Sequence, residues 1–329
     1  MLAIGLLGGL VLLVIGGDVL VRGAVSVARI AGISPLVIGL TLVGFGTSTP
    51  ELLASVQAAA IGAPAIAVGN VVGSNIANVM LIMGVAALVS PVAADAPGVR
   101  RDMLVMAAAT AAVLGLLMWG SVSRLAGAGL LGVLLVYTVG TILADKRDTA
   151  MRKIREGEAG LKETPIRIGL WAGIGLTLLG LVGVMLGARF LVHAAVELAT
   201  RWGVSQSLIG VTVVAIGTSL PELVTAIMAA IKKESDVALG NIVGSNIFNI
   251  LGILGVTALV TPIVVPHEIA VRDTWVLALS SLALVGVVLG LRHVPRALGF
   301  VFVVGYVVYI AGLAGGLPEI DIIPGVAGI

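Results

Sequence analysis

Two stretches decide the fold of this chain: residues 46–51, Gly-Thr-Ser-Thr-Pro-Glu, and residues 217–222, Gly-Thr-Ser-Leu-Pro-Glu. A second segment, Gly-Asn-Val-Val-Gly-Ser-Asn-Ile-Ala-Asn at 69–78, likewise returns at 240–249, again 171 positions later. Each copy lies in a long apolar run, where a carboxylate is costly and where proline and glycine interrupt a helix. A polar motif repeated at one offset indicates an ion site between two related halves, as in secondary transporters.

The composition places the chain in a membrane. Of its 329 residues, 59% are hydrophobic and only 11% are charged, which is too little charge to cover the surface of a soluble domain. The net charge of +2 gives no reason to expect a nucleic-acid partner. The sequence contains no cysteine, which excludes disulfides, thiolate metal sites and a thiol nucleophile.

The hydropathy pattern predicts ten membrane spans, since a bilayer core needs roughly 20 apolar residues per helix. One strongly polar connection, residues 144–167, separates five spans from the next five. We therefore predict a first five-helix repeat at 1–143, a linker at 144–167 and a second five-helix repeat at 168–329. The predicted spans are 2–28, 35–60, 65–89, 101–119, 124–143, 168–198, 206–231, 236–260, 269–290 and 296–315.

Basic residues predict the orientation of the spans. If the linker is cytoplasmic, the connections on the cytoplasmic side carry fourteen Lys and Arg residues and those on the other side carry three. Five spans before the linker then put both termini outside the cell. An odd number of spans per repeat also inverts the second half relative to the first. The sequence thus predicts a multi-pass protein of the cell membrane with inverted-topology repeats.

Glu51 and Glu222 are the candidate ligands of the ion site. A charged side chain at mid-membrane costs at least ~2.5 kcal/mol on insertion scales. One such glutamate can be explained by protonation or by a helix cap, whereas two at equivalent positions are better explained by a cation between them. Carboxylate oxygens are hard ligands that suit Ca²⁺ or Na⁺.

Neutral oxygens are expected to complete the ion site. Pro50 and Pro221 have no N–H to give to a helix, so carbonyls of the preceding turn become available. Ser74 and Asn78 are four residues apart and therefore share one helix face. The full predicted set adds the carbonyls of Gly44, Thr47, Ala215 and Thr218, the hydroxyls of Ser48, Ser219, Ser74 and Ser245, and the side-chain oxygens of Asn78 and Asn249.

Other polar residues of the spans are interpreted as structural. Asp18 and Arg22 are four residues apart and are predicted to pair. Asp102 and Asp273 each follow an arginine at the start of a span and are predicted to lie at the membrane interface. Four amides are expected to satisfy loose backbone groups: Asn70, Asn75, Asn241 and Asn246.

The paired Gly-Thr-Ser-x-Pro-Glu and Gly-Ser-Asn-x-x-Asn segments resemble the alpha repeats of the calcium:cation antiporter superfamily, specifically of its sodium/calcium exchanger branch. The resemblance covers essentially the whole chain. It implies an all-α integral membrane fold of ten helices in two inverted repeats, with the second and third helix of each half broken at the ion site. It also implies that the first and sixth helices slide against the other eight.

The same resemblance implies roles for individual residues. Glu51 and Glu222 would coordinate Ca²⁺ together with the carbonyls of Thr47 and Thr218, and Asn78 and Asn249 would line the centre. Some members of the family have an aspartate at the position of Asn249, so this chain keeps two formal negative charges, which balance one Ca²⁺. The flanking Na⁺ sites would be formed with Ser48, Ser219, Ser74 and Ser245.

These observations predict a secondary active antiporter that exchanges Ca²⁺ for Na⁺ by alternating access. The alternatives are an H⁺/Ca²⁺ antiporter and, more distantly, a cation channel. The sequence has no phosphate-binding loop, nucleophile elbow or His-Glu-x-x-His motif, so we expect no enzymatic activity. We expect no cofactor, no nucleic acid and no obligatory protein partner, with the lipid bilayer and the transported ions as the only partners.

Overall fold

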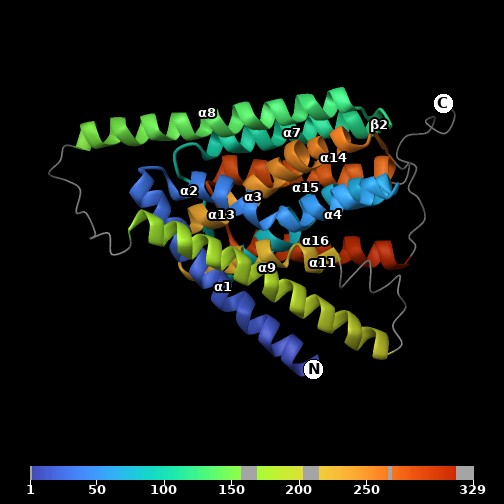
Figure 1. The fold of residues 1–329 in the computed structure, drawn as a ribbon. Helices are drawn as coiled ribbons and strands as arrows, with labels where there is room; N and C mark the ends of the chain where they lie inside the picture. The colour runs from blue at the N-terminus through green and yellow to red at the C-terminus, as the bar shows by residue number, and fades with distance from the viewer. Residues whose placement is uncertain (1, 157–168, 203–214, 266–268, 316–329) are drawn as a thin grey trace.

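The protein is almost entirely helical (Figure 1). The computed structural model describes residues 2–156, 169–202, 215–265 and 269–315. Within these ranges, eight helices are long and apolar enough to cross a membrane, and one bent pair brings the number to nine. The long helical segments are α1 (Leu2–Ala31), α5–η2–α6 (Pro64–Ala77, Asn78–Ile82, Met83–Val89), α7 (Val99–Met118), α8 (Arg124–Glu156), α9 (Leu170–Arg201), α13–η4–α14 (Ser235–Ile247, Phe248–Ile253, Leu254–Val260), η5–α15 (Ile269–Asp273, Thr274–Leu291) and α16 (Arg296–Gly315).

The second span of the first half is broken in its middle, as predicted. The helix bends by 44° between Thr47 and Thr49, where Pro50 has no N–H to give to the carbonyl of Gly46. The segments before and after the bend are α2 (Pro35–Ile38), η1 (Gly39–Val43), α3 (Gly44–Thr47) and α4 (Thr49–Ala60).

The corresponding span of the second half was predicted at 206–231. The structure describes it from Ala215 onward, as α11 (Ala215–Thr218) and α12 (Leu220–Ile231), with Pro221 at the place of Pro50. The first part of the predicted span, 206–214, lies outside the described residues.

The third helix of each half is continuous rather than broken, which corrects the expectation from the family resemblance. Pro64–Val89 and Ser235–Val260 each run as one helix of 26 residues. Neither helix contains a proline beyond its first residue, so the hydrogen-bond ladder persists. It widens into a π-helical turn at η2 and η4, which begin at Asn78 and Phe248.

The linker predicted at 144–167 is partly helical. α8 continues without interruption from the fifth span to Glu156, and 157–168 lie outside the described residues. Asp145 explains part of this extension, because its buried carboxylate accepts hydrogen bonds from the backbone N–H and the hydroxyl of Ser34, both at 2.7 Å. The fifth helix was predicted to end at residue 143, about thirteen residues before its observed end at Glu156.

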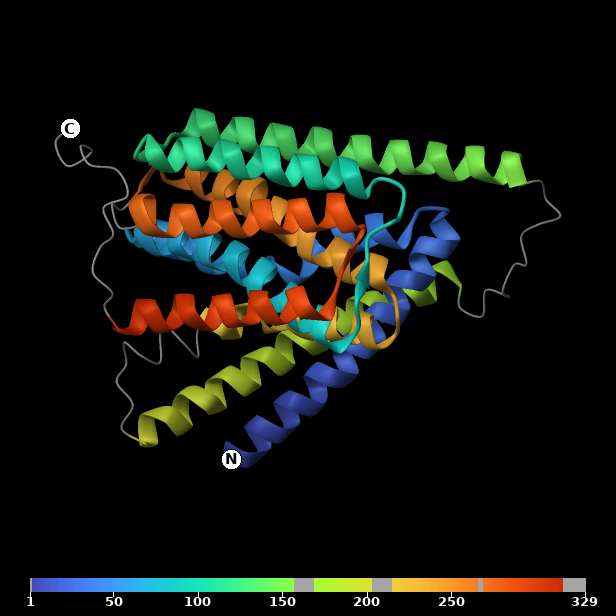
Figure 2. The ribbon, with the colours of Figure 1, turned by 180° about the vertical axis from the view of Figure 1, so that it is seen from behind.

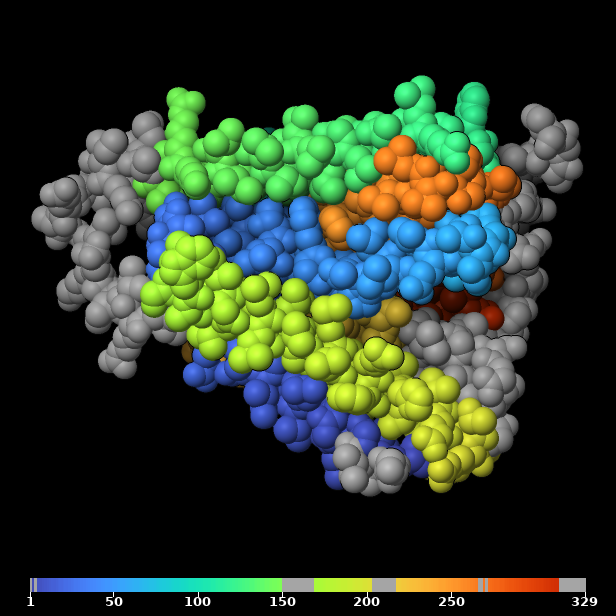
Figure 3. Space-filling model, viewed as in Figure 1, coloured from blue at the N-terminus to red at the C-terminus, as the bar shows by residue number. Residues whose placement is uncertain are grey.

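The helices form layers that both ribbon views show (Figures 1 and 2). α7 and α8 run along one side, and α1 and α9 cross obliquely on the other, with the broken helices between them. Figure 3 shows α8, the α2–α4 segment and α9 as adjacent bands on one face. The largest buried apolar cluster joins α5–η2–α6 and α13–η4–α14 to α7 and α15, with fully buried residues such as Ile76 and Ile247.

Glycines let two helix pairs approach backbone to backbone. In α9, a Cβ at Gly180 would lie 2.3 Å from the backbone nitrogen of Leu20 in α1. In α13, a Cβ at Gly244 would lie 2.1 Å from the carbonyl oxygen of Leu40 in η1. Close contacts of this kind are typical of helix packing in membranes. The second contact packs α13, from the second half, against η1, which is part of the broken helix of the first half.

Four strands of two residues each were not predicted. β1 (Val92–Ala93) pairs antiparallel with β4 (His293–Val294), and β2 (Ser121–Val122) pairs antiparallel with β3 (Ile263–Val264). Each pair joins a connection of the first half to a connection of the second. The β2–β3 pair lies at the start of α8, at the opposite end of the molecule from Glu156 (Figures 1 and 2).

Candidate functional site

Glu51 and Glu222 lie in the first turn of α4 and of α12, directly after Pro50 and Pro221. The proline starts a new helix at each position, since it fits the first turn but cannot continue the preceding one. Both glutamates are almost completely buried, each with 1% of its surface exposed. The broken helices therefore place one carboxylate from each half inside the protein.

Two crossed hydrogen bonds bring these carboxylates together. Ser48 Oγ, in the first half, donates to Glu222 Oε1 at 2.9 Å. Ser219 Oγ, at the matching place in the second half, donates to Glu51 Oε1 at 3.5 Å. Each serine is three residues before the glutamate of its own half, so the two acids face each other across the break points. The geometry gathers the two predicted acids and their serines at one place.

Four buried oxygens of the predicted ligand residues have no hydrogen-bond donor among the described residues: Glu51 Oε2, Glu222 Oε2, Asn78 Oδ1 and Asn249 Oδ1. η2, which carries Asn78, contacts α12, and η4, which carries Asn249, contacts α4 and α5. A buried oxygen acceptor left without a donor costs free energy, and more so when it is charged. These residues fit a hard cation, because carboxylate and amide oxygens are the ligands that Ca²⁺ and Na⁺ prefer.

The predicted carbonyl and hydroxyl ligands differ in what they contact. The Gly44 carbonyl accepts bonds from the Ser48 N–H, the Thr47 hydroxyl and the Ser245 hydroxyl, at 3.2, 3.3 and 3.2 Å, so protein donors use it in this structure. Thr47 Oγ1 also donates to Asn241 Oδ1 at 3.2 Å.

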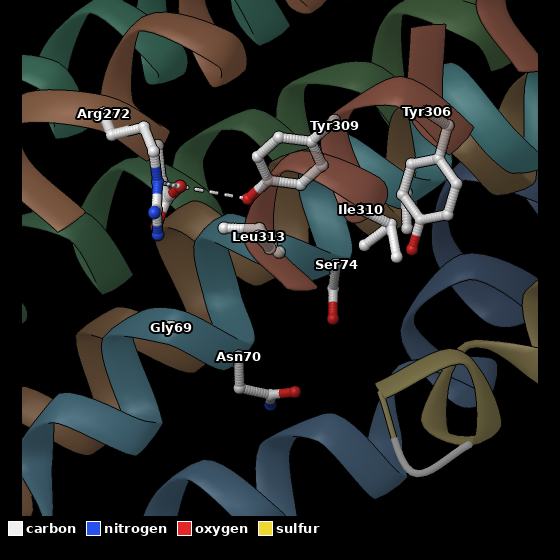
Figure 4. Close-up of a pocket in the computed structure, with 11 residues that line it drawn as sticks. Gly69, Asn70, Ser74, Arg272, Tyr306, Tyr309, Ile310 and Leu313 are labelled. Carbon is white, nitrogen blue, oxygen red and sulfur yellow. Dashed lines mark hydrogen bonds and ion pairs between the residues drawn. The ribbon is translucent and has the colours of Figure 1, made fainter. Parts of the chain in front are cut away.

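The remaining predicted ligands are on α11, α5 and α13. Thr218 ends α11 immediately before Ser219, and Ala215 begins that helix. Ser74 is 94% buried on α5 and lines a cavity, which Figure 4 shows together with Asn70. Ser245, its repeat mate, is fully buried and lines no described cavity.

The asparagines interpreted as structural bind other protein groups. Asn70 Nδ2 donates to the Glu51 carbonyl at 3.0 Å, and Asn241 Nδ2 donates to the Glu222 carbonyl at 3.3 Å. These matched bonds fix the first turn of each glutamate-bearing helix. Asn75 Nδ2 bonds the Val71 carbonyl, and Asn246 accepts a bond from Asn78 Nδ2 at 3.3 Å.

Asp102, which was predicted to lie at the membrane interface, is in the first turn of α7 and is buried against other parts of the protein. Its side chain is 1% exposed, and it accepts bonds from Arg101 Nε at 2.8 Å and from the Tyr137 hydroxyl at 3.2 Å. Asp273 has the same partners in the second half, Arg272 Nε at 3.0 Å and the Tyr309 hydroxyl at 3.1 Å. The sequence comparison of the two halves did not pair Tyr137 with Tyr309, because these residues are 172 positions apart and the repeated motifs are 171 positions apart.

Asp18 and Arg22 form the predicted ion pair, at 2.8 Å. Asp18 also contacts Lys232 Nζ at 2.5 Å, which the sequence did not indicate. This contact ties α1 to the end of α12, because Lys232 directly follows Ile231. Within the described residues, no three His, Asp or Glu side chains cluster as a resident metal site would require.

Known proteins resemble this chain over nearly its full length. A family model described as "Sodium/calcium exchanger protein" matches residues 1–143 and 172–314. The putative antiporter CaxA of Alkalimonas amylolytica is 39% identical over 309 residues, covering 92% of this chain and 95% of that protein. The sodium/calcium exchanger MaX1 of Methanosarcina acetivorans is 34% identical over 344 residues, covering 94% of this chain and 97% of that protein.

Solved structures agree with the sequence relatives. The sodium-calcium exchanger NCX_Mj, soaked with zero Na⁺ and Ca²⁺, matches with a TM-score of 0.80 and 33% identity, covering 95% of this chain and all of that one. The same exchanger soaked with Na⁺ and Sr²⁺ also matches with a TM-score of 0.80. The match in sequence and in fold shows that this multi-pass membrane protein belongs to the sodium/calcium exchanger branch of the calcium:cation antiporters.

Proposed function

We propose that this protein exchanges Ca²⁺ for Na⁺ across the membrane, with the ions bound between Glu51 and Glu222. The observation that carries the proposal is the pair of crossed serine bonds that brings the two buried acids together, with donorless oxygens on residues of both halves. Two carboxylates supply two negative charges, which one Ca²⁺ balances. The name of the relative MaX1 and the family description support sodium as the coupling ion.

The charge of the site gives a mechanism for coupling. With Ca²⁺ bound, the two carboxylates are neutralised and the site can close away from water. Several Na⁺ ions achieve a comparable balance. An empty site keeps two close negative charges, which are costly to enclose in a low-dielectric interior. Only loaded forms then change sides, and exchange follows without any chemical step, so the protein acts as a transporter and not as an enzyme.

The proposed architecture has ten spans in two inverted repeats, with the linker in the cytoplasm and both termini outside the cell. The bias of basic residues toward the linker side supports this orientation. The offset of 171 between matched motifs, and the crossed bonds they make, support the equivalence of the two halves. In this scheme α1 and α9, packed through glycines, move together against the remaining helices.

Transport by purified protein in vesicles tests the proposal. We expect labelled Ca²⁺ uptake when a Na⁺ gradient is imposed at equal pH on both sides. Uptake that ignores Na⁺ and follows a pH gradient would show proton coupling instead. Single-channel currents far above ~10³ ions per second, the upper range of enzyme-like turnover, would show a channel and overturn antiport.

A further inference from the structure

A cavity of about 370 Å³ lies beside α5, and Ser74, one of the predicted ligands, is part of its lining (Figure 4). It lies between α5, the start of α15 and α16, and its lining includes Asp273, Tyr309, Ser74 and Asn70. Asn70 donates to the carbonyl of Glu51 at 3.0 Å, so this wall of the cavity belongs to the turn that carries the ion ligand. The lining of the cavity thus extends from Asp273 to Asn70, which is bonded to the backbone carbonyl of Glu51.

Asp273 is held by two neighbours that we call, with it, the outer triad: Arg272, Asp273 and Tyr309. Arg272 Nε and the Tyr309 hydroxyl both contact Asp273 Oδ1, at 3.0 and 3.1 Å. Figure 4 shows the Tyr309 hydroxyl directed at the carboxylate beside the cavity. The positive charge of Arg272 neutralises the Asp273 carboxylate, so a cation would be held there only weakly. A cation in the cavity can replace the half-exposed arginine as its partner.

The first half contains the same arrangement in a sealed form. The inner triad consists of Arg101, Asp102 and Tyr137, with contacts to Asp102 Oδ1 at 2.8 and 3.2 Å. Asp102 is 1% exposed, against 13% for the Asp273 side chain. Arg101 lies in the first turn of α7, and Arg272 lies in η5, which leads into α15. The inner triad lies toward the β1–β4 end of the molecule, and the outer triad lies toward the β2–β3 end.

The surrounding glycines differ in the same way as the triads. Gly69 and Gly73 of α5 line the cavity at the outer triad. Their repeat mates, Gly240 and Gly244 of α13, pack against the backbone of α2 and η1, and Cβ atoms there would lie 2.4 and 2.1 Å from the carbonyl oxygens of Leu36 and Leu40. Among the described residues, the outer triad thus borders a cavity, whereas the glycines equivalent to the wall of that cavity are packed against other helices.

We propose that Asp273 receives cations at this cavity and passes them toward Ser74 and Glu51, and that Asp102 does the same at the linker side when that side opens. This inference rests on the proposed function. If each half adopted the conformation that the other half has in this structure, Asp102, Asn241 and Ser245 would line an equivalent cavity. They would there correspond to Asp273, Asn70 and Ser74. The two triads then set the apparent ion affinity separately on the two faces of the membrane.

Sided transport measurements test this proposal. In vesicles with protein of known orientation, we expect Asp273→Asn to raise the KM for Ca²⁺ about fivefold when Ca²⁺ is added at the face opposite the linker, with kcat nearly unchanged. Asp102→Asn should raise the KM only for Ca²⁺ added at the linker face. An unchanged KM for Asp273→Asn, or an equal change at both faces, would overturn the proposal.

Two further variants guard against misfolding of the buried Asp102→Asn protein. Tyr309→Phe and Tyr137→Phe keep both aspartate–arginine pairs and remove one hydroxyl each, so the same sided shifts in KM are expected at smaller size. Asp273→Glu keeps the negative charge, so this variant should have the same KM as the unmodified protein. If the unmodified protein transports no Ca²⁺, the proposed function fails. If it transports Ca²⁺ and the variants show no sided effect, only the role of the triads fails.

The absence of cysteine in the sequence allows a structural test that needs no transport. Ser74→Cys and Ser245→Cys are matched single substitutions at repeat-related positions. A membrane-impermeant thiol reagent added at the face opposite the linker should label Ser74→Cys much faster than Ser245→Cys. Faster labelling of Ser74→Cys from the linker face would show that the cavity opens to the wrong side.

Discussion

Ser48 and Glu222 are separated by 174 positions in the chain, and Ser48 Oγ donates to Glu222 Oε1 over 2.9 Å. The matching bond from Ser219 to Glu51 is longer, at 3.5 Å. Neither half of the chain thus completes the surroundings of its own acid. The candidate ion site is complete only when the two halves are assembled against each other.

The unequal lengths of these bonds predict unequal effects of removing each serine. We expect Ser48→Ala to lower the apparent Ca²⁺ affinity roughly tenfold, since a short hydrogen bond to a buried charged group is worth about 1.5–3 kcal/mol. Ser219→Ala should have a smaller effect because its bond is at the limit of hydrogen-bond length. Ca²⁺ titration of transport by both variants measures the difference. A larger loss in Ser219→Ala would contradict the geometry.

Removing the charge of either acid should nearly abolish exchange. For Glu51→Gln and Glu222→Gln we expect Ca²⁺ flux to fall roughly 100-fold or more, because a buried divalent ion loses a charged partner. The control is Gln57→Leu, an exposed position six residues along the same helix, which should transport normally. Both glutamine variants should still insert into the membrane. Substantial Na⁺-driven flux in both of them would remove the site assignment.

The contact of α13 with η1 predicts an intolerance to any side chain at Gly244. A methyl group there would overlap the Leu40 carbonyl, so Gly244→Ala should destabilise the protein by about 1–3 kcal/mol or more. Gly129→Ala is the matched control, because the position is exposed on α8 and no described atom lies within 4 Å of a built Cβ. Thermal unfolding of the two variants in detergent compares them. Equal melting temperatures would show that the two helices are not packed this closely.

The ion pair between Asp18 and Lys232 predicts a measurable coupling between α1 and α12. Both side chains are about three-quarters buried, at 27% and 22% exposed, so we expect a coupling free energy of about 1 kcal/mol in a double-mutant cycle of Asp18→Asn and Lys232→Met. The comparison pair is Glu197 and Arg201, which lie within α9 with side chains 41% and 64% exposed. That cycle should give a coupling near zero. Additive effects of Asp18→Asn and Lys232→Met on stability would contradict a tie between the helices.

The sequence identified the acids and the breaks because their chemistry is local. A proline inside an apolar run must interrupt a helix, and Glu51 and Glu222 stand out because a membrane makes charge expensive. Pro50 and the 44° bend are therefore found together. The offset of 171 then relates the two acids without any knowledge of their distance in space.

The features that the sequence did not predict depend on distant parts of the chain. Asp102 is buried because Tyr137 supplies a hydroxyl from another helix, and no local pattern reveals that contact. The extension of α8 past residue 144 is supported by Ser34 from the other end of the first half. The third helices remained whole because a π-helical turn accommodates Asn78 and Asn249 without a proline, and composition does not distinguish that turn from a break.

The two short strand pairs and the exchanged serine bonds all run from one half of the chain to the other. A polypeptide of half this length would carry one glutamate but would lack the serine that steadies it and the strand that closes its connection. Only the other half of the chain supplies both.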